Sequence, residues 1–281
     1  MSRKTLIIGC GYIGLPLALR FKEQGNEVDV WVHSKVSADA LAEYCFRQII
    51  IGSVADANVW NGVHETYDRV IHCASSGKGG ETVYREVFLR GARMMVQRQP
   101  QARSIFVSST SVYGQMQGEV VTEESAAEPT SVTSRILREA EDVALAAGVI
   151  VVRSSGIYGP NRGVLFEKFR KSEAVIEGDG LRWINQIHQR DLMAALIHLT
   201  EVGELGQIYN ATDDTPVTYR DFYAWCSDFL QKPMPSFGPV NLERKRGLTN
   251  KRVSNVKLRA TGWVPQYPSF REGLVADHSP K

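Results

Sequence analysis

The sequence has few cysteines, and their spacing excludes several kinds of site. The 281 residues include only Cys10, Cys45, Cys73 and Cys226, and no two of them form a CxxC pair. This pattern argues against both a zinc site and a disulfide framework. We therefore expect no metal, and free thiols in a reducing compartment.

Long apolar runs are also missing. The longest nearly apolar stretch, residues 143–152, is too short to cross a bilayer. The chain enters an apolar run at residues 5–8 without the core of a signal peptide. The sequence therefore predicts a cytoplasmic protein with no membrane partner. With 43% hydrophobic and 23% charged residues, the composition is typical of a globular protein rather than a disordered one.

Short apolar runs alternate with helical patterns through most of the chain. We expect strands at residues 6–8, 27–32, 48–51, 69–73, 104–107, 149–153 and 207–210. We expect helices at residues 13–24, 38–45, 81–97, 134–147 and 191–199. This alternation predicts an α/β fold, a Rossmann-type doubly wound parallel sheet. The looser pattern beyond residue 160 predicts a smaller, discontinuous C-terminal substrate lobe at 161–184 plus 213–281.

A glycine-rich turn lies between the first expected strand and the first expected helix. Gly9, Gly11 and Gly14 form a GxGxxG pattern there. In this context Gly9 allows a tight turn, Gly11 lets a pyrophosphate approach, and Gly14 lets helix and strand pack closely. Tyr12 and Ile13 would present backbone N–H groups to the phosphates. The alternative is a turn whose glycines serve packing only. Dinucleotide binding is favoured, with residues 1–160 plus 185–212 as the NAD(P)-binding domain.

The end of the second strand bears on which dinucleotide is bound. NAD sites usually carry an acid there for the ribose hydroxyls. This chain has His33, Ser34 and Lys35 instead. A serine and a cation suit a 2′-phosphate, and His33 could stack on adenine. We therefore expect NADP in preference to NAD, the alternative being a solvated turn with an incidental lysine.

Several later segments fall into one ordered pattern. They are residues 70–74, 107–114, 153–160, 188–191 and 208–211. With the glycine turn before them, they resemble the extended short-chain dehydrogenase/reductase superfamily, in its NAD(P)-dependent epimerase/dehydratase family. The tail, residues 251–268, resembles the YeeZ-like atypical branch. The resemblance implies a small-molecule substrate, a homodimer of the kind that family members often form, and cofactor contacts from Cys73, Ala74, Ser75, Gly156 and Ile157.

The resemblance also implies catalytic positions, and here the chain departs from the family. Ser109 stands where the family has the Ser or Thr that orients the substrate oxygen. Ser131 stands at the family's Tyr, Arg135 at its Lys and Phe88 at its Asn. A serine hydroxyl is too weak an acid for proton transfer near neutrality. Arg135 stays charged, so it could contact the ribose or stabilise negative charge but not shuttle a proton.

Other candidate side chains each have a plainer alternative. Ser131 precedes a helix, where serine is a good N-cap, and this role is favoured over a chemical one. Tyr158 could donate a proton, or could pack under the substrate lobe. Lys78 could grip an anionic substrate, or could lie in a glycine-rich loop. His72 and His188 are expected to be structural, each with a hydrogen-bond partner.

The formal net charge of +2 conceals a basic stretch. Residues 244–259 hold seven basic residues and no acid. They also hold no aromatic residue for stacking on bases, so we expect no nucleic acid. One interpretation is a solvated surface. The other is that some of these cations face a cleft and bind an anionic substrate, with Arg252 as the first candidate for contacting it. In the resembled family such a substrate is often a nucleotide-linked sugar. The chain is thus expected to be an atypical NAD(P)-binding oxidoreductase or epimerase/dehydratase, the alternative being a non-catalytic NAD(P)-binding sensor.

Overall fold

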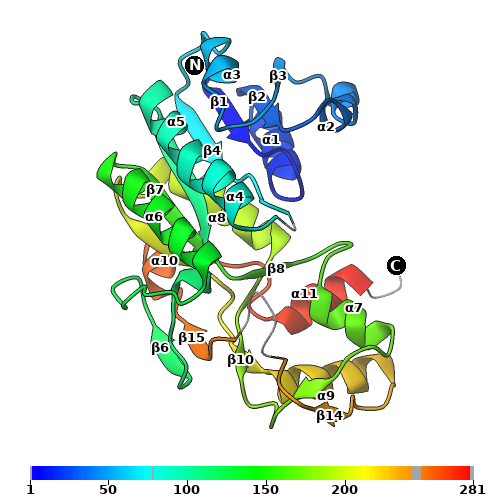
Figure 1. The fold of residues 1–281 in the computed structure, drawn as a ribbon. Coiled ribbons are helices and arrows are strands. Elements are labelled where there is room, and N and C mark those ends of the chain that lie inside the picture. Colours follow the sequence, from blue (N-terminus) through cyan, green and yellow to red (C-terminus); the bar gives the residue numbers. More distant parts are fainter. Residues whose placement is uncertain (1, 78, 242–247, 279–281) are drawn as a thin grey trace. The chain divides into compact units, whose positions relative to one another are not determined.

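The fold is described from a computed structural model, which covers residues 2–77, 79–241 and 248–278 (Figure 1). Lys78 lies outside the described residues. So do Arg244, Lys245 and Arg246 of the basic stretch. The remaining expected site residues can be placed in the fold.

A seven-stranded sheet organises the first part of the chain. Its strands are β1 (Lys4–Ile8), β2 (Glu27–Val32), β3 (Gln48–Ile51), β4 (Arg69–His72), β5 (Arg103–Ser109), β7 (Ile150–Ser154) and β12 (Ile208–Ala211). The strand order is β12-β7-β5-β4-β1-β2-β3, with parallel registers from β5 through β3. The order reverses at β1, so the sheet is doubly wound, as the sequence predicts.

Helices connect these strands. They are α1 (Gly14–Glu23), α2 (Lys35–Asp39), the short η1 (Ala42–Tyr44), α3 (Ala57–Asn61), α4 (Glu81–Tyr84), η2 (Arg85–Arg90), α5 (Gly91–Arg98), η3 (Thr110–Val112), α6 (Val132–Ala146) and α8 (Gln189–Val202). Helices α5 and α6 pack side by side (Figure 1). Leu6, Ile7, Val70, Ile105 and Val151 are fully buried, which places the apolar runs of the sequence in the sheet's core.

The prediction of one helix is wrong, and another predicted helix contains a π-helical segment that the sequence did not indicate. In place of a helix at residues 38–45, α2 begins after Ser34 and the chain turns at Cys45, whose φ is +49°. Ser34 starts the helix early because its hydroxyl accepts the N–H of Ser37. The expected helix at 81–97 contains a π-helical segment, η2, between α4 and α5. Such segments are often found at functional sites.

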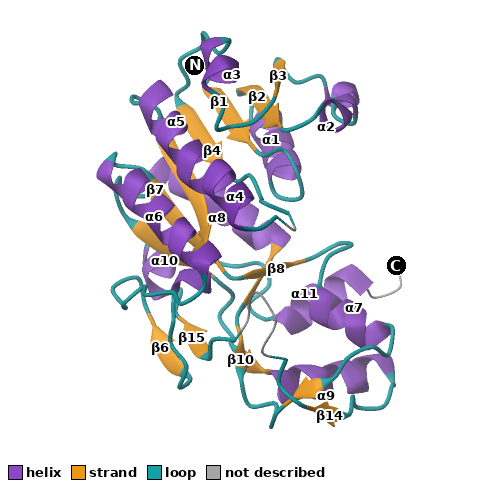
Figure 2. Cartoon of the chain, in the orientation of Figure 1, coloured by secondary structure: helices purple, strands orange, loops and turns teal. Residues whose placement is uncertain are grey.

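The second part of the chain is built from short strands and four further helices (Figure 2). The strands are β6 (Glu119–Val121), β8 (Gly156–Tyr158), β9 (Ile176–Glu177), β10 (Trp183–Ile184), β11 (Gln186–His188), β13 (Val217–Thr218), β14 (Phe237–Gly238) and β15 (Lys251–Val253). They form two-stranded pairs β8–β11, β10–β13, β9–β14 and β6–β15. The helices are α7 (Val164–Arg170), α9 (Tyr219–Leu230), α10 (Val256–Ala260) and α11 (Phe270–His278).

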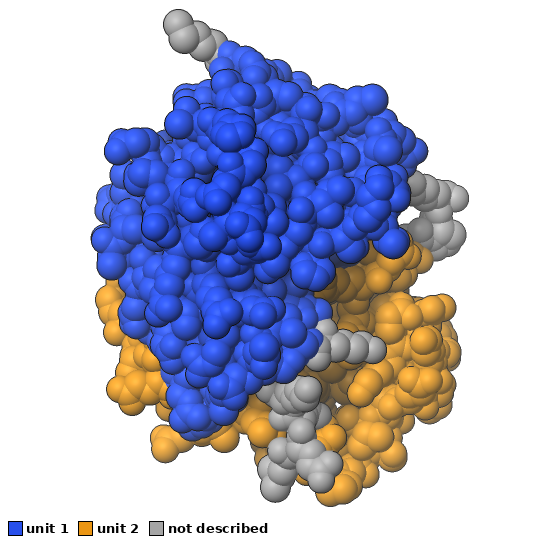
Figure 3. All heavy atoms as spheres, turned by 45° about the horizontal axis from the view of Figure 1, so that its top comes forward, with its two compact units in different colours: residues 1–112, 129–153, 195–209 blue, residues 113–128, 154–194, 210–281 orange. Residues whose placement is uncertain are grey.

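The chain divides into two compact units (Figure 3). Unit 1 comprises residues 1–112, 129–153 and 195–209, and unit 2 comprises residues 113–128, 154–194 and 210–281. Four segments expected in the first domain therefore group with unit 2: residues 113–128, 154–160, 185–194 and 210–212. Unit 2 has its own aromatic core, which includes Tyr158, Phe166, Phe222 and Phe270. Among the described residues, no helix is both long and apolar enough to span a membrane.

Candidate functional site

The glycine loop of unit 1, residues 9–14, has the geometry of a phosphate-binding turn. Gly9 has a φ of +94°, and a Cβ there would lie 2.3 Å from the Cα of Ala74. A Cβ on Gly14 would lie 2.1 Å from the carbonyl oxygen of Gly9. A Cβ on Gly11 would meet nothing within 4 Å. Packing therefore explains two of these glycines, whereas the exposed Gly11 leaves space that a ligand can enter.

The helix behind this loop offers its N-terminus to an anion. No side chain caps α1, and no acid lies in its first turn. The N–H groups of Gly9 and Cys10 both donate to the carbonyl of Trp31, at 3.0 and 3.2 Å, which fixes the loop on the end of β2. The positive end of the helix dipole thus lies behind an open backbone turn, an arrangement that suits the phosphates of a dinucleotide.

The residues after β2 are only partly available. His33 and Lys35 are exposed, whereas the hydroxyl of Ser34 caps α2 and lies 3.0 Å from that of Ser37. Lys35 pairs with Asp39 at 2.5 Å, and both side chains are largely exposed. An exposed pair of this kind contributes little stability, so the lysine can exchange its partner at low cost.

The end of β4 packs directly on the glycine loop. The thiol of Cys73 lies 3.4 Å from the carbonyl of Gly9, and Ala74 lies under the position a Gly9 side chain would occupy. Ser75 is exposed and its hydroxyl accepts the N–H of Gly77. Burial raises the pKa of the Cys73 thiol to about 12, so this group is a thiol rather than a thiolate.

His72, just before this turn, is fully buried. Its Nε2 lies 3.0 Å from the carbonyl oxygen of Val87 in the π-helical segment η2. Burial lowers the pKa of the imidazole to about 4. The ring is therefore neutral near pH 7, and its N–H donates to the carbonyl. A Cβ on Gly91 would lie 2.8 Å from the same Nε2, so the glycine makes room for the histidine.

Four serines form a hydrogen-bonded group, which we call the serine cluster: Ser109, Ser111, Ser131 and Ser134. Ser109 accepts the N–H of Ser111 at 3.1 Å. The hydroxyl of Ser134 donates to that of Ser111 at 3.2 Å. Ser131 is the N-cap of α6, and accepts the N–H of Ser134 at 3.2 Å. The residue at the family's tyrosine position thus holds a helix end, and no member of the cluster is a strong enough acid for proton transfer near neutrality.

Arg135 lies one turn into α6 and is exposed. The described residues offer its side chain neither a hydrogen bond nor an ion pair. Its guanidinium is therefore available to an anionic ligand of unit 1. A guanidinium can bind negative charge through its fork of N–H donors but is unsuited to proton transfer.

A buried ion pair beneath the serine cluster escaped sequence reasoning. Glu141 on α6 is 0% exposed and accepts two parallel hydrogen bonds from Arg153 of β7, at 3.0 and 2.7 Å. Ser108 donates to the same carboxylate at 2.5 Å. These residues are not neighbours in sequence, so no local motif identifies the pair. The one available signal is that the helical pattern of α6 places Glu141, a charged residue, on the buried face of the helix.

Tyr158 lies in the core of unit 2, 2% exposed. Its hydroxyl donates to the carbonyl of Ser269 at 3.3 Å, and its ring packs edge-on against His188. Burial, and then the nearby carboxylates of Asp213 and Asp191, raise the pKa of the phenol. Each effect makes it a poorer proton donor, and the geometry agrees with the packing alternative.

Gly156 and Ile157 precede Tyr158 in β8, also in unit 2. They pair with Gln186 and Ile187 of β11. The N–H of Gly156 donates to the carbonyl of Asn185 at 3.1 Å. The expected cofactor residues are therefore divided between the two units, with these two in unit 2 and the others in unit 1.

Arg252, the expected substrate residue, is half-buried in β15. Its Nε donates to the carbonyl of Gly118 at 2.9 Å, and its guanidinium lies 5.3 Å from the ring centroid of Trp183. The adjacent Lys251 is only 5% exposed. The Lys251 ammonium donates to the carbonyl of Tyr113 at 3.0 Å and to the hydroxyl of Thr249 at 2.6 Å. The sequence singles out Arg252 as a substrate residue and gives no sign that its neighbour Lys251 is buried.

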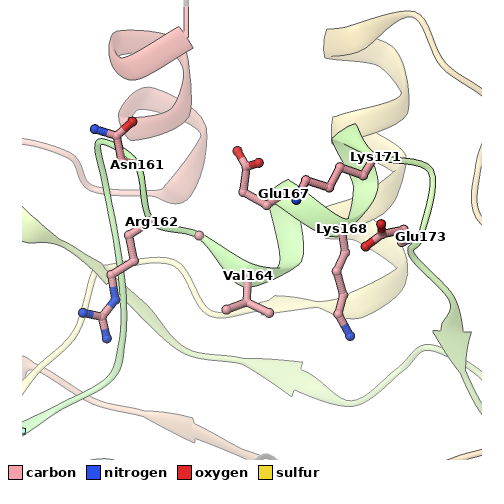
Figure 4. A pocket seen from close by; sticks show the side chains of 8 residues that line it. Asn161, Arg162, Val164, Glu167, Lys168, Lys171 and Glu173 are labelled. Carbon is pink, nitrogen blue, oxygen red and sulfur yellow. The ribbon is translucent and has the colours of Figure 1, made fainter. Parts of the chain in front are cut away.

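A hollow of about 320 Å³ opens on the surface of unit 2, around α7 (Figure 4). Its lining includes Lys168, Lys171, Glu167 and Glu173, charges of both signs. No residue expected at the site lines it, and we assign it no role. In the described part of the chain, no group of three or more His, Cys, Asp or Glu side chains could hold a metal ion.

Comparison with known proteins agrees with this geometry. The chain is 28% identical to the protein YeeZ of Escherichia coli K12, across 95% of this chain and 97% of that protein. A solved structure from Methylobacillus flagellatus, described as a putative NAD-dependent epimerase/dehydratase, is 26% identical and superposes with a TM-score of 0.79, covering 98% of this chain and 97% of the other.

A third similarity is one of fold. The dTDP-glucose 4,6-dehydratase of Bacillus anthracis, solved in complex with NAD, is 19% identical, with a TM-score of 0.82 over 98% of this chain and 95% of that one. The model of the NAD dependent epimerase/dehydratase family matches residues 5–212, from the first strand to the last strand of the sheet. Since that match spans most of the chain, the protein belongs to the NAD dependent epimerase/dehydratase family.

Proposed function

We propose that the protein is an NAD(P)-dependent oxidoreductase or epimerase/dehydratase with an atypical catalytic centre. Its substrate is a small anionic molecule, of the nucleotide-sugar class that the dehydratase relative's name indicates. The observation that carries the proposal is the glycine loop, where Gly9 and Gly14 are required by packing and Gly11 is left open. A bound nicotinamide would supply the hydride acceptor or donor.

The chain's own residues then have distinct roles in binding. Backbone groups at Gly11, Tyr12 and Ile13 hold the phosphates at the N-terminus of α1. The remaining cofactor contacts come from His33, Ser34, Lys35, Cys73, Ala74, Ser75, Arg135, Gly156 and Ile157. The residues from 33–35 and 73–75 follow the strand ends that contact the loop in unit 1, Arg135 lies on α6 of the same unit, and Gly156 and Ile157 lie in β8 of unit 2.

Ser109 orients the substrate oxygen, and Arg135 stabilises negative charge that develops on it. Ser131 caps α6, and Tyr158 supports the core of unit 2. None of these four side chains supplies a proton near neutral pH. The catalytic centre is atypical in this sense, since proton transfer falls to another residue or to water.

NADP is the preferred cofactor in this proposal. Its support is the absence of an acid at the end of β2 and the weakly engaged ammonium of Lys35. NADPH should bind more tightly than NADH, and Lys35→Ala should reduce affinity for NADPH alone. Lys168→Ala, at an exposed lysine of α7, is the matched control. Equal or tighter binding of NADH to the wild type contradicts this preference.

A cytoplasmic location and a homodimer belong to the same proposal. All four cysteines are free thiols, as a reducing compartment would require. Light scattering of the purified protein measures the oligomeric state directly. A mass of one chain at micromolar concentration would remove the dimer from the proposal.

The test of activity uses purified protein with dTDP-glucose and UDP-glucuronic acid as probes. Reduced nicotinamide is followed by absorbance, and the sugar by NMR, because an epimerisation leaves no net redox change. Conversion of either probe that depends on NAD(P) supports the proposal. Failure of NAD and NADP to bind overturns it.

The second candidate is a non-catalytic NAD(P)-binding sensor. It is favoured by one observation, that the residue at the family's tyrosine position caps a helix. Cofactor binding with no conversion, even in a broad screen of nucleotide sugars, would select it over the enzyme.

A further inference from the structure

A second hollow, of about 210 Å³, lies in unit 1, and we call it the arginine hollow. It is lined by Arg3, Asp68, Arg69, Arg103, Thr200 and Glu201. Arg3 precedes β1, Arg69 begins β4 and Arg103 begins β5, whereas the glycine loop follows the other end of β1. Because these strands are parallel, the arginine hollow and the glycine loop lie at opposite edges of the sheet.

The sheet register places two of these arginines next to each other. Arg69 and Arg103 are direct partners on the adjacent parallel strands β4 and β5. Neighbouring strands lie about 4.8 Å apart, so the two side chains leave the backbone at adjacent positions. Like charges that face each other across two strands are destabilising. A negative charge in the hollow would offset this repulsion.

The described part of the chain supplies one carboxylate to these arginines, that of Glu201 in the last turn of α8. Arg3 donates to it at 2.9 Å, and Arg69 donates to the same group. The side chain of Arg69 is only 4% exposed, whereas that of Glu201 is 49% exposed. The other acid of the hollow, Asp68, accepts the backbone N–H of Lys4. A buried guanidinium therefore depends for its charge balance on one carboxylate that solvent reaches.

Arg103 has no carboxylate partner among the described residues. Its Nη2 donates to the carbonyl of Leu199 at 3.3 Å and to the carbonyl of Gly203, at the end of α8. Its Nε is buried and finds no acceptor in the part of the chain that the structure describes. A buried N–H without an acceptor costs free energy. The helix end accounts for Nη2, and a ligand in the hollow could supply the acceptor that Nε lacks.

We propose that the arginine hollow binds a small phosphate-type oxyanion, held by Arg3, Arg69 and Arg103. Glu201 balances the arginines when the anion is absent and moves aside when it binds. The guanidinium fork matches the oxygens of a phosphate group. The volume is below the roughly 300–1,000 Å³ of sites for drug-sized ligands, so it suits a phosphate group rather than a whole nucleotide. The inference does not rest on the proposed function, because no residue of the glycine loop or the serine cluster lines this hollow.

The first test titrates the whole chain with inorganic phosphate at constant ionic strength. Protein labelled with ¹⁵N at arginine Nε is followed by NMR, and the Arg103 signal is assigned by its loss in Arg103→Lys. A saturable shift of that signal with a Kd below about 10 mM supports the proposal. Sodium chloride in place of phosphate is the control for screening. No saturation up to about 10 mM phosphate, or an equal shift with chloride, overturns the proposal.

The second test uses variants to locate the bound phosphate. Arg3→Met, at a half-exposed side chain, should weaken phosphate binding roughly 3- to 10-fold. Glu201→Gln removes the competing carboxylate and should tighten binding by a similar factor. Arg85→Met, which removes an exposed pair elsewhere, should change nothing. A Kd unaltered in both Arg3→Met and Glu201→Gln overturns the proposal.

A further variant separates this hollow from the glycine loop, which is itself proposed to hold phosphates. Gly11→Val should leave the phosphate shift of Arg103 intact, since the loop lies at the opposite edge of the sheet. Loss of that shift in Gly11→Val would assign the anion to the loop and overturn the proposal. Methyl phosphate, as a second probe, shows whether a site supported by these tests also takes a phosphate ester.

Discussion

The glycine loop and the serine cluster, both in unit 1, are the proposed cofactor-binding and catalytic regions, and they differ in which residue types they require. The loop binds through backbone N–H groups, so it needs glycines at Gly9, Gly11 and Gly14 and little else. The serine cluster lies at the proposed catalytic position, where the resemblance implies titratable side chains. It keeps the helix cap at Ser131 and has no group that titrates near neutrality. Cofactor binding and proton transfer can thus be lost or moved independently.

Each region also has its own buried support. Glu141 and Arg153 hold α6 beneath the serine cluster, and His72 holds η2 beside the glycine loop. These supports show that both regions are held by buried polar contacts. Four predictions test the comparison, in order of decreasing effect.

Removing Arg153 should have the largest effect. Arg153→Met removes the bidentate partner of the buried Glu141, which keeps only Ser108 and, at 3.7 Å, Arg138, so it should lower the free energy of unfolding by about 3–5 kcal/mol. Urea denaturation measures the change. Arg85→Met is the control, since its pair with Glu81 is exposed, and it should cost at most about 1 kcal/mol. If Arg153→Met lowers the free energy of unfolding by less than about 1 kcal/mol, as an exposed pair would, the buried pair does not support the serine cluster.

His72 should make stability depend on pH. Its pKa is about 4 in the folded protein and 6.5 in the unfolded chain, so the unfolded state binds more protons between these values. Stability from this group is present above pH 6.5 and is lost as pH falls towards 4, by about 3 kcal/mol in all.

The measurement compares urea unfolding of wild type and His72→Gln at pH 7 and pH 5. The difference between the two proteins should shrink at pH 5, because the variant has no buried imidazole to protonate. Parallel pH dependences would show that the support beside the glycine loop does not rest on a neutral His72.

Gly11→Val separates binding from folding. A Cβ at Gly11 meets nothing within 4 Å, so the melting temperature should be unchanged. The new side chain enters the space for the pyrophosphate and should cost about 1–3 kcal/mol, roughly 10- to 100-fold in the Kd for NADPH. Gly9→Val should lower the melting temperature and also weaken NADPH binding. Gly62→Ala, in the turn after α3, should change neither quantity. Unaltered binding by Gly11→Val would place the dinucleotide elsewhere.

Ser131→Ala should have the smallest effect, about 1 kcal/mol on stability, as expected for loss of an N-cap. Ser131→Asp should restore most of this, because aspartate is an equally good cap. Turnover should survive both changes if Ser131 is structural. A folded Ser131→Asp without activity would show that the hydroxyl itself takes part in catalysis.

The sequence predicted what depends on local pattern. The strands at residues 27–32 and 48–51 have the expected bounds, and the turn at Gly9–Gly14 lies where its spacing indicates. Thr218 caps α9 by accepting the N–H of Asp221, three residues along the chain. These features are encoded by neighbouring residues, through alternation, capping and the conformational freedom of glycine.

What the sequence could not show depends on contacts between distant residues. The π-helical turn at Arg85–Arg90 accompanies the bond from His72 to Val87, fifteen residues away. Glu141 reads as a surface charge until Arg153 is placed beside it. Lys251 reads as one more residue of a basic stretch, because its burial depends on Tyr113, 138 residues before it.

The most direct measurement is turnover of nucleotide-sugar probes in wild type, Ser131→Ala and Gly11→Val, alongside the Kd of each protein for NADPH. The account predicts that wild type and Ser131→Ala bind NADPH and convert the probe at similar rates, whereas Gly11→Val is folded but binds NADPH roughly 10- to 100-fold more weakly and converts the probe correspondingly less at the same NADPH concentration. A wild type that does not bind the dinucleotide, or a folded Ser131→Ala that binds it and has lost its turnover, would contradict the account.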